Sequence, residues 1–300
     1  MERTEPDLNR RREVRAESLL MLVVVIWASN YPVAKWGIAG LGVWVFNAIR
    51  FVVAAAGVAV YFRLRCTWMP VQREDWPSLL KASLVAGVVY QVAFILGLSM
   101  TTAGNSAVLM ATSPLWTLLF DARIHRRRIP APMIAGMLIS LAGVVMIVIG
   151  SGKKMEFGIA ALAGDLISLS AGALWALNTT LQKPIVARYP AAQVSLIMLT
   201  VGAIGLSLLA IPAALLLPWQ GAGPTHYLAA LMSGLLSIGA ANVIWTYGVK
   251  FLGPGRTSLF SNLIPVLAFL ISYFTLDEQV LPIHFIGAAV TVGGVWYARR

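Results

Sequence analysis

Ten long apolar runs divide the chain, and they constrain its fold more than any other feature. Each has roughly the 20 residues that a helix needs to cross the hydrocarbon core of a bilayer. The runs are Ser18–Ile38, Gly42–Phe62, Leu79–Met100, Thr102–Phe120, Met133–Gly150, Ile159–Gln182, Val194–Leu217, His226–Tyr247, Thr257–Leu276 and Ile283–Ala298. Residues 1–17 form a polar, charged tail. No small-residue cleavage site follows the first run, so we expect it to be a membrane span and not a cleaved signal peptide.

The scarcity of charge argues against a soluble fold. Only 12% of the 300 residues are charged and 59% are apolar, whereas a soluble domain carries about 25% charged residues. So few charges cannot cover a surface that faces water. We therefore predict an all-α membrane protein with ten transmembrane helices.

The basic residues predict the orientation of these helices. With a cytoplasmic N-terminus, 19 of the 23 Lys and Arg residues lie inside and only Lys153 and Lys154 lie outside. Lys35 and Arg50 fall within the runs. Because Lys and Arg favour cytoplasmic loops, we expect both termini in the cytoplasm and the protein in a bacterial inner membrane. Anionic membrane lipids suit the net charge of +11, and its spread over six short segments argues against nucleic-acid binding.

The chain also repeats itself. Trp27-Ala-Ser-Asn30 matches Trp175-Ala-Leu-Asn178, and Lys35 matches Lys183, each 148 residues later. An offset of 151 residues relates Gln91 to Asn242, Gly97 to Gly248, Pro114 to Pro265, Gly136 to Gly287 and Gly143 to Gly294. These matches define two repeats, residues 18–150 and 159–300, joined by an outer, periplasmic connector at 151–158.

Each repeat holds five runs, and an odd number inverts the second copy relative to the first. Inverted repeats are typical of carriers that work by alternating access, with the binding site near the bilayer midplane between the halves. A duplication retained for folding alone is the alternative.

Several of these residues resemble the drug/metabolite transporter superfamily, specifically its ten-helix exporters with two EamA-type repeats. The resemblance lies in Trp27-Ala-Ser-Asn30 with Lys35, Arg50, Gly164-Asp165, Ser-Pro114, Ile-Pro265, Glu278 and Gly287 with Gly294. It covers residues 18–298 and is nearest to the bacterial aromatic amino-acid exporters. In the first repeat, Arg127 replaces the acidic counterpart of Glu278, which argues against a matched pair of gates.

The two repeated tryptophans are the first candidate substrate-binding residues. Trp27 and Trp175 lie too deep for the interfacial belt in which Trp usually occurs. They form either a stacking wall for an aromatic substrate or packing between the repeats. Asn30 and Asn178 follow one turn later, and each either binds substrate or joins helices by hydrogen bonds.

Other candidates are aromatic or neutral and polar. They are Tyr90, Gln91, Phe94, Trp116, Asn242, Trp245, Tyr247, Ser261 and Asn262. Together they predict an aromatic cavity with a few polar groups. Such a cavity suits a ring with a zwitterionic head, and it suits sugars or nucleosides almost as well.

Charges and prolines inside the runs are the remaining candidates. Arg50 either captures a substrate carboxylate or has a structural partner in helix-end carbonyls, and Lys35 can extend to the outer surface. Pro114 and Pro265 each remove one amide donor. Their symmetric positions predict bending points or a cavity wall rather than incidental kinks.

Several absences limit the chemistry. No Asp or Glu lies at mid-membrane, so we expect no proton-coupling site and disfavour cationic drugs as substrates. The three histidines lie far apart and Cys66 is the single cysteine, so we expect no metal, cofactor or enzymatic activity.

The sequence therefore predicts a carrier that exports small metabolites, with aromatic amino acids favoured. Other amino acids or metabolites are the alternative substrates. A non-transporting membrane scaffold or a lipid-modifying enzyme is the alternative class. The paired glycines either pack spans within one chain or form a homodimer.

Overall fold

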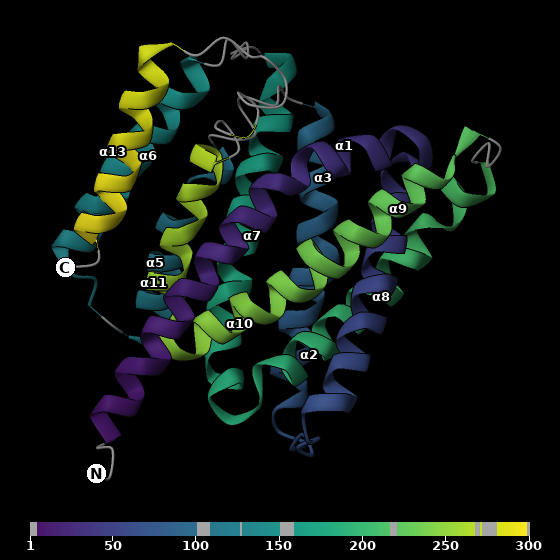
Figure 1. The fold of residues 1–300 in the computed structure, drawn as a ribbon, viewed down its shortest axis with the longest axis horizontal. Coiled ribbons are helices and arrows are strands. Elements are labelled where there is room, and N and C mark those ends of the chain that lie inside the picture. Colours follow the sequence, from purple (N-terminus) through teal and green to yellow (C-terminus); the bar gives the residue numbers. More distant parts are fainter. Residues whose placement is uncertain are drawn as a thin grey trace. The chain divides into compact units, whose positions relative to one another are not determined.

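The computed structural model describes residues 5–100, 109–126, 128–150, 159–216, 221–267, 271 and 281–298. Regular structure in these ranges is helical throughout, which agrees with the predicted all-α class (Figure 1). The predicted connector at 151–158 lies outside them, as do Arg127, Glu278 and much of the fourth and ninth runs. The number of ten spans, the two-repeat division and the cytoplasmic termini remain predictions.

The chain forms two compact units, and each draws on both sequence repeats. Unit 1 comprises residues 1–88 and 181–253, and unit 2 comprises residues 89–180 and 254–300. Sequence repeats and compact units therefore differ, because helices of one repeat pack against helices of the other.

Unit 1 begins with α1 (Glu5–Arg65), which contains the first two apolar runs. Its backbone departs from helical geometry at Gly42, where φ is 66° and ψ is 162°. A positive φ favours glycine because a Cβ would clash there. The helix begins at Glu5, so part of the predicted polar tail is a helical extension of the first run.

The other helices of unit 1 are α2 (Trp76–Leu84), the π-helical turn η1 (Val85–Val89), α8 (Ala191–Leu216), α9 (Pro224–Met232), the π-helical segment η3 (Ser233–Ala240) and α10 (Ala241–Leu252). Here α1 packs along α8, α9, η3 and α10 (Figure 1). One buried core joins Phe51 and Ala54 of α1 to Leu199 and Leu206 of α8. The long α7 (Ile159–Arg188) starts in unit 2 and ends in unit 1.

Unit 2 contains α3 (Tyr90–Met100), α5 (Ser113–His125), α6 (Ala131–Gly150), α11 (Pro254–Ser258), the 3-10 turn η4 (Leu259–Asn262) and α13 (Pro282–Ala298). Helices α6 and α13 lie side by side (Figure 1). Leu118 of α5, Met137 of α6, Leu259 of η4 and Val295 of α13 share a core.

Four glycines let α6 and α13 approach closely. A Cβ on Gly143 would lie 2.6 Å from the Gly287 carbonyl oxygen, and one on Gly294 would lie 2.6 Å from the Gly136 carbonyl oxygen. These are the glycines paired by the 151-residue offset. These four glycines therefore form a contact between two helices of one chain in this structure.

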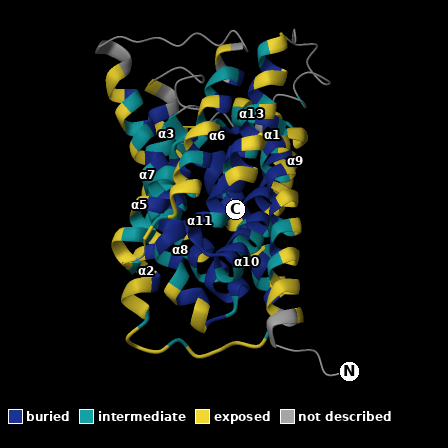
Figure 2. Cartoon of the chain, turned by 90° about the vertical axis from the view of Figure 1, so that its left-hand side faces the viewer, coloured by how far each residue is buried: buried dark blue, intermediate teal, exposed yellow. Residues whose placement is uncertain are grey.

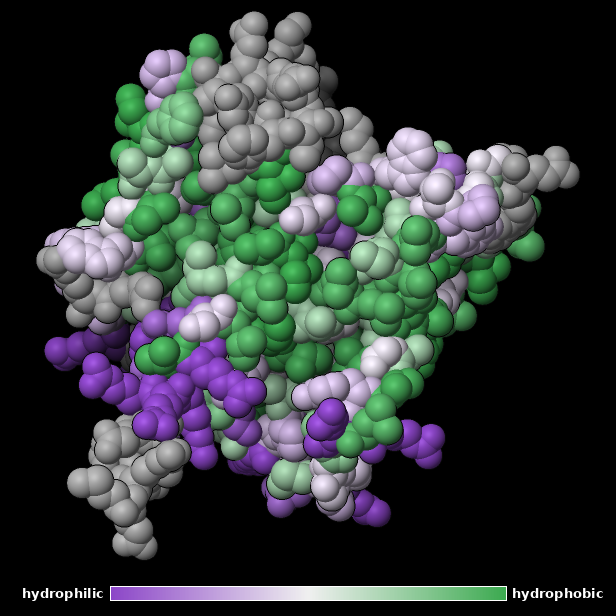
Figure 3. Space-filling model, viewed as in Figure 1, coloured by the Kyte–Doolittle hydropathy of each residue, from purple (hydrophilic) through white to green (hydrophobic). Residues whose placement is uncertain are grey.

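Five described helices are long and apolar enough to cross a membrane. They are Asn9–Ala34, Trp36–Arg65, Trp76–Gly97, Ala191–Leu216 and Pro224–Leu252. These helices carry exposed large apolar residues, among them Leu228, Leu231 and Met232 of α9. Figure 2 shows exposed positions along α9 in yellow. In Figure 3, hydrophilic side chains gather beside the N-terminal end of α1, which carries exposed arginines. Apolar helix surfaces with the hydrophilic side chains gathered at one end suit contact with lipid.

Candidate functional site

In unit 1, Trp27 lies against a helix from the other repeat. Its indole N–H donates to the Ser237 carbonyl oxygen at 3.0 Å, and its ring lies 5.1 Å from that of Trp245 at an interplanar angle of 41°. The Ser233 hydroxyl donates to Asn30 one turn along α1. Trp27 and Asn30 thus join α1 to η3 and α10, which is the geometry of the helix-joining alternative.

A π-helical stretch forms part of this contact. Ser237 lies within η3, and residues 236–240 of η3 correspond by the 151-residue offset to η1, residues 85–89. Equivalent positions of both repeats are therefore π-helical. Such insertions are rare and frequently occur at functional sites, and the sequence of these stretches carries no signal for them.

In unit 2, the repeated tryptophan also meets an aromatic partner. The ring of Trp175 lies 5.2 Å from that of Tyr90 at 43°, and Tyr90 lies 6.0 Å from Phe94. Helices α3 and α7 approach closely here, since a Cβ on Gly97 would lie 2.8 Å from the Ser168 amide nitrogen. All three aromatic residues are half-buried.

Irregular backbone precedes each of the two prolines. Before Pro114, the chain turns at Ala111 and Thr112, and the Thr112 hydroxyl donates to the Leu109 carbonyl oxygen at 2.6 Å. Before Pro265, η4 replaces α-helix with a 3-10 turn. A proline that cannot donate an amide proton accounts for both irregularities.

Asn262 of η4 is tied to α6. Its side-chain nitrogen donates to the Ser140 hydroxyl at 3.0 Å, and Asn262 is 1% exposed. Ser261, beside it, is half-buried.

Arg50 lies within unit 1 and is 9% exposed. It donates to Asn47 Oδ1 at 3.1 Å, and its guanidinium lies 5.1 Å from the centre of the Phe46 ring. Asn47 in turn donates to the Val43 carbonyl oxygen at 2.9 Å. These contacts favour a structural role over capture of a carboxylate. The side chain of Lys35 lies outside the described residues.

The other predicted site residues are dispersed. Asn242 donates within its own helix to the Ile238 carbonyl oxygen at 2.7 Å, and Tyr247 packs on Phe251 at 4.5 Å. Trp116 packs on Phe120 at 6.2 Å. Gln91 is half-buried, and Asn178 is buried. Among the described residues, no group of three or more His, Cys, Asp or Glu side chains could hold a metal ion.

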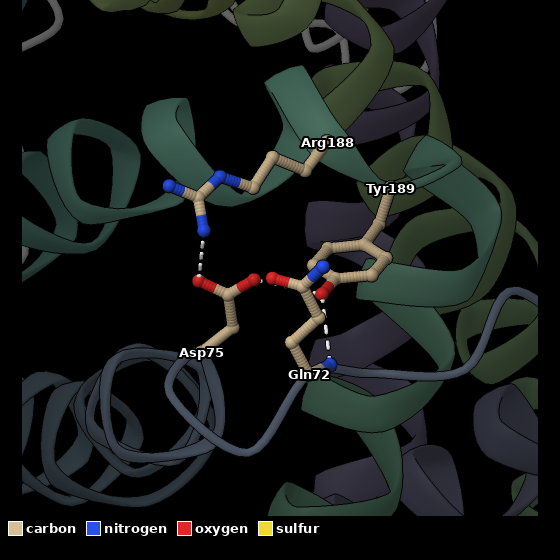
Figure 4. Close-up of polar contacts among 4 residues, drawn as sticks. All are labelled: Gln72, Asp75, Arg188 and Tyr189. Atoms are coloured by element: carbon tan, nitrogen blue, oxygen red, sulfur yellow. Dashed lines mark hydrogen bonds and ion pairs between the residues drawn. The ribbon is translucent and has the colours of Figure 1, made fainter.

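Sequence reasoning missed a polar cluster at one end of unit 1, which Figure 4 shows. Arg188 donates to Asp75 Oδ1 at 2.6 Å, and the Tyr189 hydroxyl donates to Asp75 Oδ2 at 2.7 Å. The Gln72 amide donates to the Tyr189 oxygen at 3.0 Å. The bonds from Tyr189 and Arg188 lower the pKa of Asp75, and Asp75 raises the pKa of Arg188. Such pairs carry no local sequence signal, because Asp75 and Arg188 lie 113 residues apart.

Two further contacts strengthen this end of the unit. The fully buried amide of Gln193 accepts from the Met69 amide at 3.0 Å and donates to its carbonyl oxygen at 2.6 Å. Lys250 at the end of α10 donates to the Tyr189 carbonyl oxygen at 3.1 Å. The 66–75 loop, the α7–α8 turn and α10 are therefore fastened together, and we call these contacts the polar clamp.

The chain is similar to known proteins over most of its length. The family model of the EamA-like transporter family matches residues 14–149 and 162–300. A probable terminal-alkyne amino-acid exporter of Streptantibioticus cattleyicolor is 26% identical over 285 residues, which cover 94% of this chain and 92% of that protein. An uncharacterised transporter of Archaeoglobus fulgidus is 26% identical over 282 residues, 93% of this chain and 95% of that protein.

The fold has a solved counterpart. A crystal structure matches with a TM-score of 0.80 at 20% sequence identity and covers 95% of this chain and 98% of its own chain. The family match extends over most of both sequence repeats, and the named relatives are transporters rather than enzymes. The chain therefore belongs to the EamA-like transporter family.

Proposed function

We propose that this protein exports amino acids with aromatic side chains across a bacterial inner membrane by alternating access. The observation that carries the proposal is that the two repeat-equivalent tryptophans each lie against a second aromatic ring. Trp27 meets Trp245 in unit 1, and Trp175 meets Tyr90 in unit 2. Paired aromatic faces stack favourably on an aromatic ligand.

The two pairs suit different tasks. Trp245 is 1% exposed, and the Trp27 indole donates to a backbone carbonyl, so this pair mainly joins helices. Trp175 and Tyr90 are half-buried, which leaves part of each ring accessible. The Trp175 pair is therefore the better surface for a substrate ring.

Neutral surroundings support a zwitterionic amino acid. The described parts of the apolar runs offer amides and hydroxyls but no mid-membrane carboxylate, and a carrier of cations needs such a counter-charge. The similarity to the probable terminal-alkyne amino-acid exporter of Streptantibioticus cattleyicolor favours a second candidate, a terminal-alkyne amino acid. Its linear π-bonded group requires less width than an indole.

Uptake into liposomes that hold the purified protein tests the proposal. The labelled substrates are tryptophan, phenylalanine, propargylglycine and alanine. We expect saturable uptake of the aromatic pair, weak uptake of alanine, and loss of aromatic uptake in Trp175→Ala. Trp296→Ala is the matched control, because Trp296 is 57% exposed on α13.

Each result has a defined meaning. Preference for propargylglycine over both aromatic substrates would replace aromatic specificity with that of the second candidate. Uptake of all four substrates no greater than in empty liposomes, for folded protein, would reject both candidate functions. An equal loss of aromatic uptake in Trp175→Ala and Trp296→Ala would show that Trp175 does not contact the substrate.

A further inference from the structure

The ninth apolar run contains an irregular turn whose oxygen atoms are not all satisfied. Helix α11 ends at Ser258, η4 continues as a 3-10 turn to Asn262, and residues 263–267 resume a helix that contains Pro265. Pro265 has no amide proton, so the Ser261 carbonyl loses the donor that a regular α-helix would supply. Irregular backbone inside a membrane protein is tolerated where it is buried in protein or lines a cavity.

Two side-chain oxygens at this turn are buried without a hydrogen-bond partner among the described residues. They are Ser261 Oγ and Asn262 Oδ1. The Asn262 amide is oriented by its other end, where Nδ2 donates to the Ser140 hydroxyl at 3.0 Å. A buried polar group without a partner is uncommon in native proteins and requires an explanation.

The chemistry of the turn favours an ammonium ligand. Asn262 Oδ1 accepts only, Ser261 Oγ accepts or donates, and the adjacent Ser261 carbonyl accepts. An ammonium group supplies three donors and no acceptor, whereas a carboxylate would meet oxygen atoms. Carbonyls of interrupted helices bind cations in other transporters.

Contacts within unit 2 connect this turn to the half-buried aromatic pair. Ala111, at the break before Pro114, packs on Val144 of α6, one helical turn beyond Ser140. A Cβ on Gly172 of α7 would lie 3.2 Å from the Leu109 carbonyl oxygen at the same break. Gly172 precedes Trp175 by about one turn, so both breaks and the helix of Trp175 form one contiguous region.

We propose that Ser261 and Asn262 receive the α-ammonium group of the amino-acid substrate at the break in the ninth run. This inference rests on the proposed function and assigns one end of the same substrate. Because Asn262 Oδ1 is sealed in the present conformation, the ammonium reaches it when the residues around η4 separate. The buried oxygens then gain the donors that they lack here.

Competition against labelled tryptophan uptake tests the assignment. Tryptamine has the indole and the ammonium without the carboxylate, and indole-3-propionate has the indole and the carboxylate without the ammonium. In wild type we expect tryptamine to compete more strongly. In Asn262→Leu we expect the inhibition constant of tryptamine to rise about tenfold, because one hydrogen bond to a charged group is lost. The inhibition constant of indole-3-propionate should stay unchanged.

Two variants serve as controls. Ser170→Ala removes an exposed hydroxyl that donates within its own helix to the Leu166 carbonyl oxygen, and it should leave both inhibition constants unchanged. Ser261→Ala removes a hydroxyl without a described partner, so the protein should fold normally while tryptamine competes less well. This second variant decides the question if Asn262→Leu does not fold. Unchanged tryptamine competition in folded Asn262→Leu, or in Ser261→Ala when Asn262→Leu does not fold, overturns the proposal.

A separate measurement distinguishes failure of this inference from failure of the proposed function. If wild type transports no aromatic amino acid, the proposed function fails. Thermal unfolding of the purified protein with butylamine or tryptamine then tests ammonium binding directly. A rise in the midpoint for wild type but not for Ser261→Ala supports the ammonium site, and no rise with either amine rejects it.

Discussion

The close approach of α6 and α13 gives the sharpest test of the structure, because two adjacent glycines of α13 face different surroundings. A Cβ on Gly294 would lie 2.6 Å from the Gly136 carbonyl oxygen and 2.8 Å from the Ser140 Cα. A Cβ on Gly293 would meet no atom within 4 Å. Gly293→Ala is therefore a matched control for Gly294→Ala.

The expected magnitude follows from the geometry. Contacts of carbon with backbone oxygen or nitrogen between helices normally measure at least about 3.3 Å. The nearest atom to a Cβ on Gly294 is the Ser140 amide nitrogen at 2.4 Å, so Gly294→Ala requires the backbones to separate by roughly 0.9 Å. A gap of that size removes about a quarter to a half of the dispersion energy of the atoms concerned. We expect Gly294→Ala to lower the free energy of unfolding by about 1–3 kcal/mol, and Gly293→Ala to leave it unchanged or slightly higher.

The assay is reversible unfolding in mixed micelles with increasing SDS, followed by tryptophan fluorescence. The midpoint should fall for Gly294→Ala and stay at the wild-type value for Gly293→Ala. Equal midpoints for both variants, at equal recovery of folded protein, would refute close packing of α6 on α13 at this position. A fall that depends on protein concentration would show instead that the glycines pack between two chains.

Three further predictions concern unit 1. Trp27→Phe should lower the free energy of unfolding by at least about 0.5–1.5 kcal/mol, because a smaller aromatic ring remains while the donor to Ser237 is lost; unchanged stability in the SDS titration would contradict that hydrogen bond. The lowered pKa of Asp75 makes the polar clamp stabilising at pH values above the ordinary aspartate pKa of 3.8, and this contribution is lost as the pH falls below it. The thermal midpoint of wild type should therefore exceed that of Asp75→Asn at pH 7 and approach it near pH 3 (about one unit below the ordinary value), and a gap independent of pH would contradict the ion pair. Cys66 should react with a membrane-impermeant maleimide only after cells are permeabilised, with Cys66→Ser as the blank, and labelling of intact cells would reverse the predicted orientation.

The repeat-equivalent tryptophans and prolines were predictable because each has a strong local signal. A deep Trp or a mid-run Pro is unusual in itself, and its recurrence at a fixed offset is visible without coordinates. The breaks before Pro114 and Pro265 followed from the missing amide proton. The interpretation of Asn30 stayed open because an amide in an apolar run suits a helix partner and a substrate equally well, and only the position of Ser233 distinguishes them.

The π-helical turns and the polar clamp were not predictable. An insertion such as η3 disturbs the local hydrogen-bond ladder, and it persists where tertiary contacts such as the Trp27 bond to Ser237 compensate. The loop at 66–75 carries no local pattern that indicates a tertiary contact. Its attachment depends on Arg188, Tyr189 and Gln193 from a segment more than 100 residues away.

The sequence by itself determined the membrane class, the repeat offset and the family, because hydropathy and repetition can be read from the order of the residues without coordinates. Only the tertiary structure decided which segments are partners: α1 with η3 and α10, α7 with α3, and α6 with α13. The physical reason is that lipid solvates any apolar helix about equally well, so hydrophobicity does not select a helix's partner. Their pairing depends instead on small residues that allow close approach and on a few hydrogen bonds between distant positions.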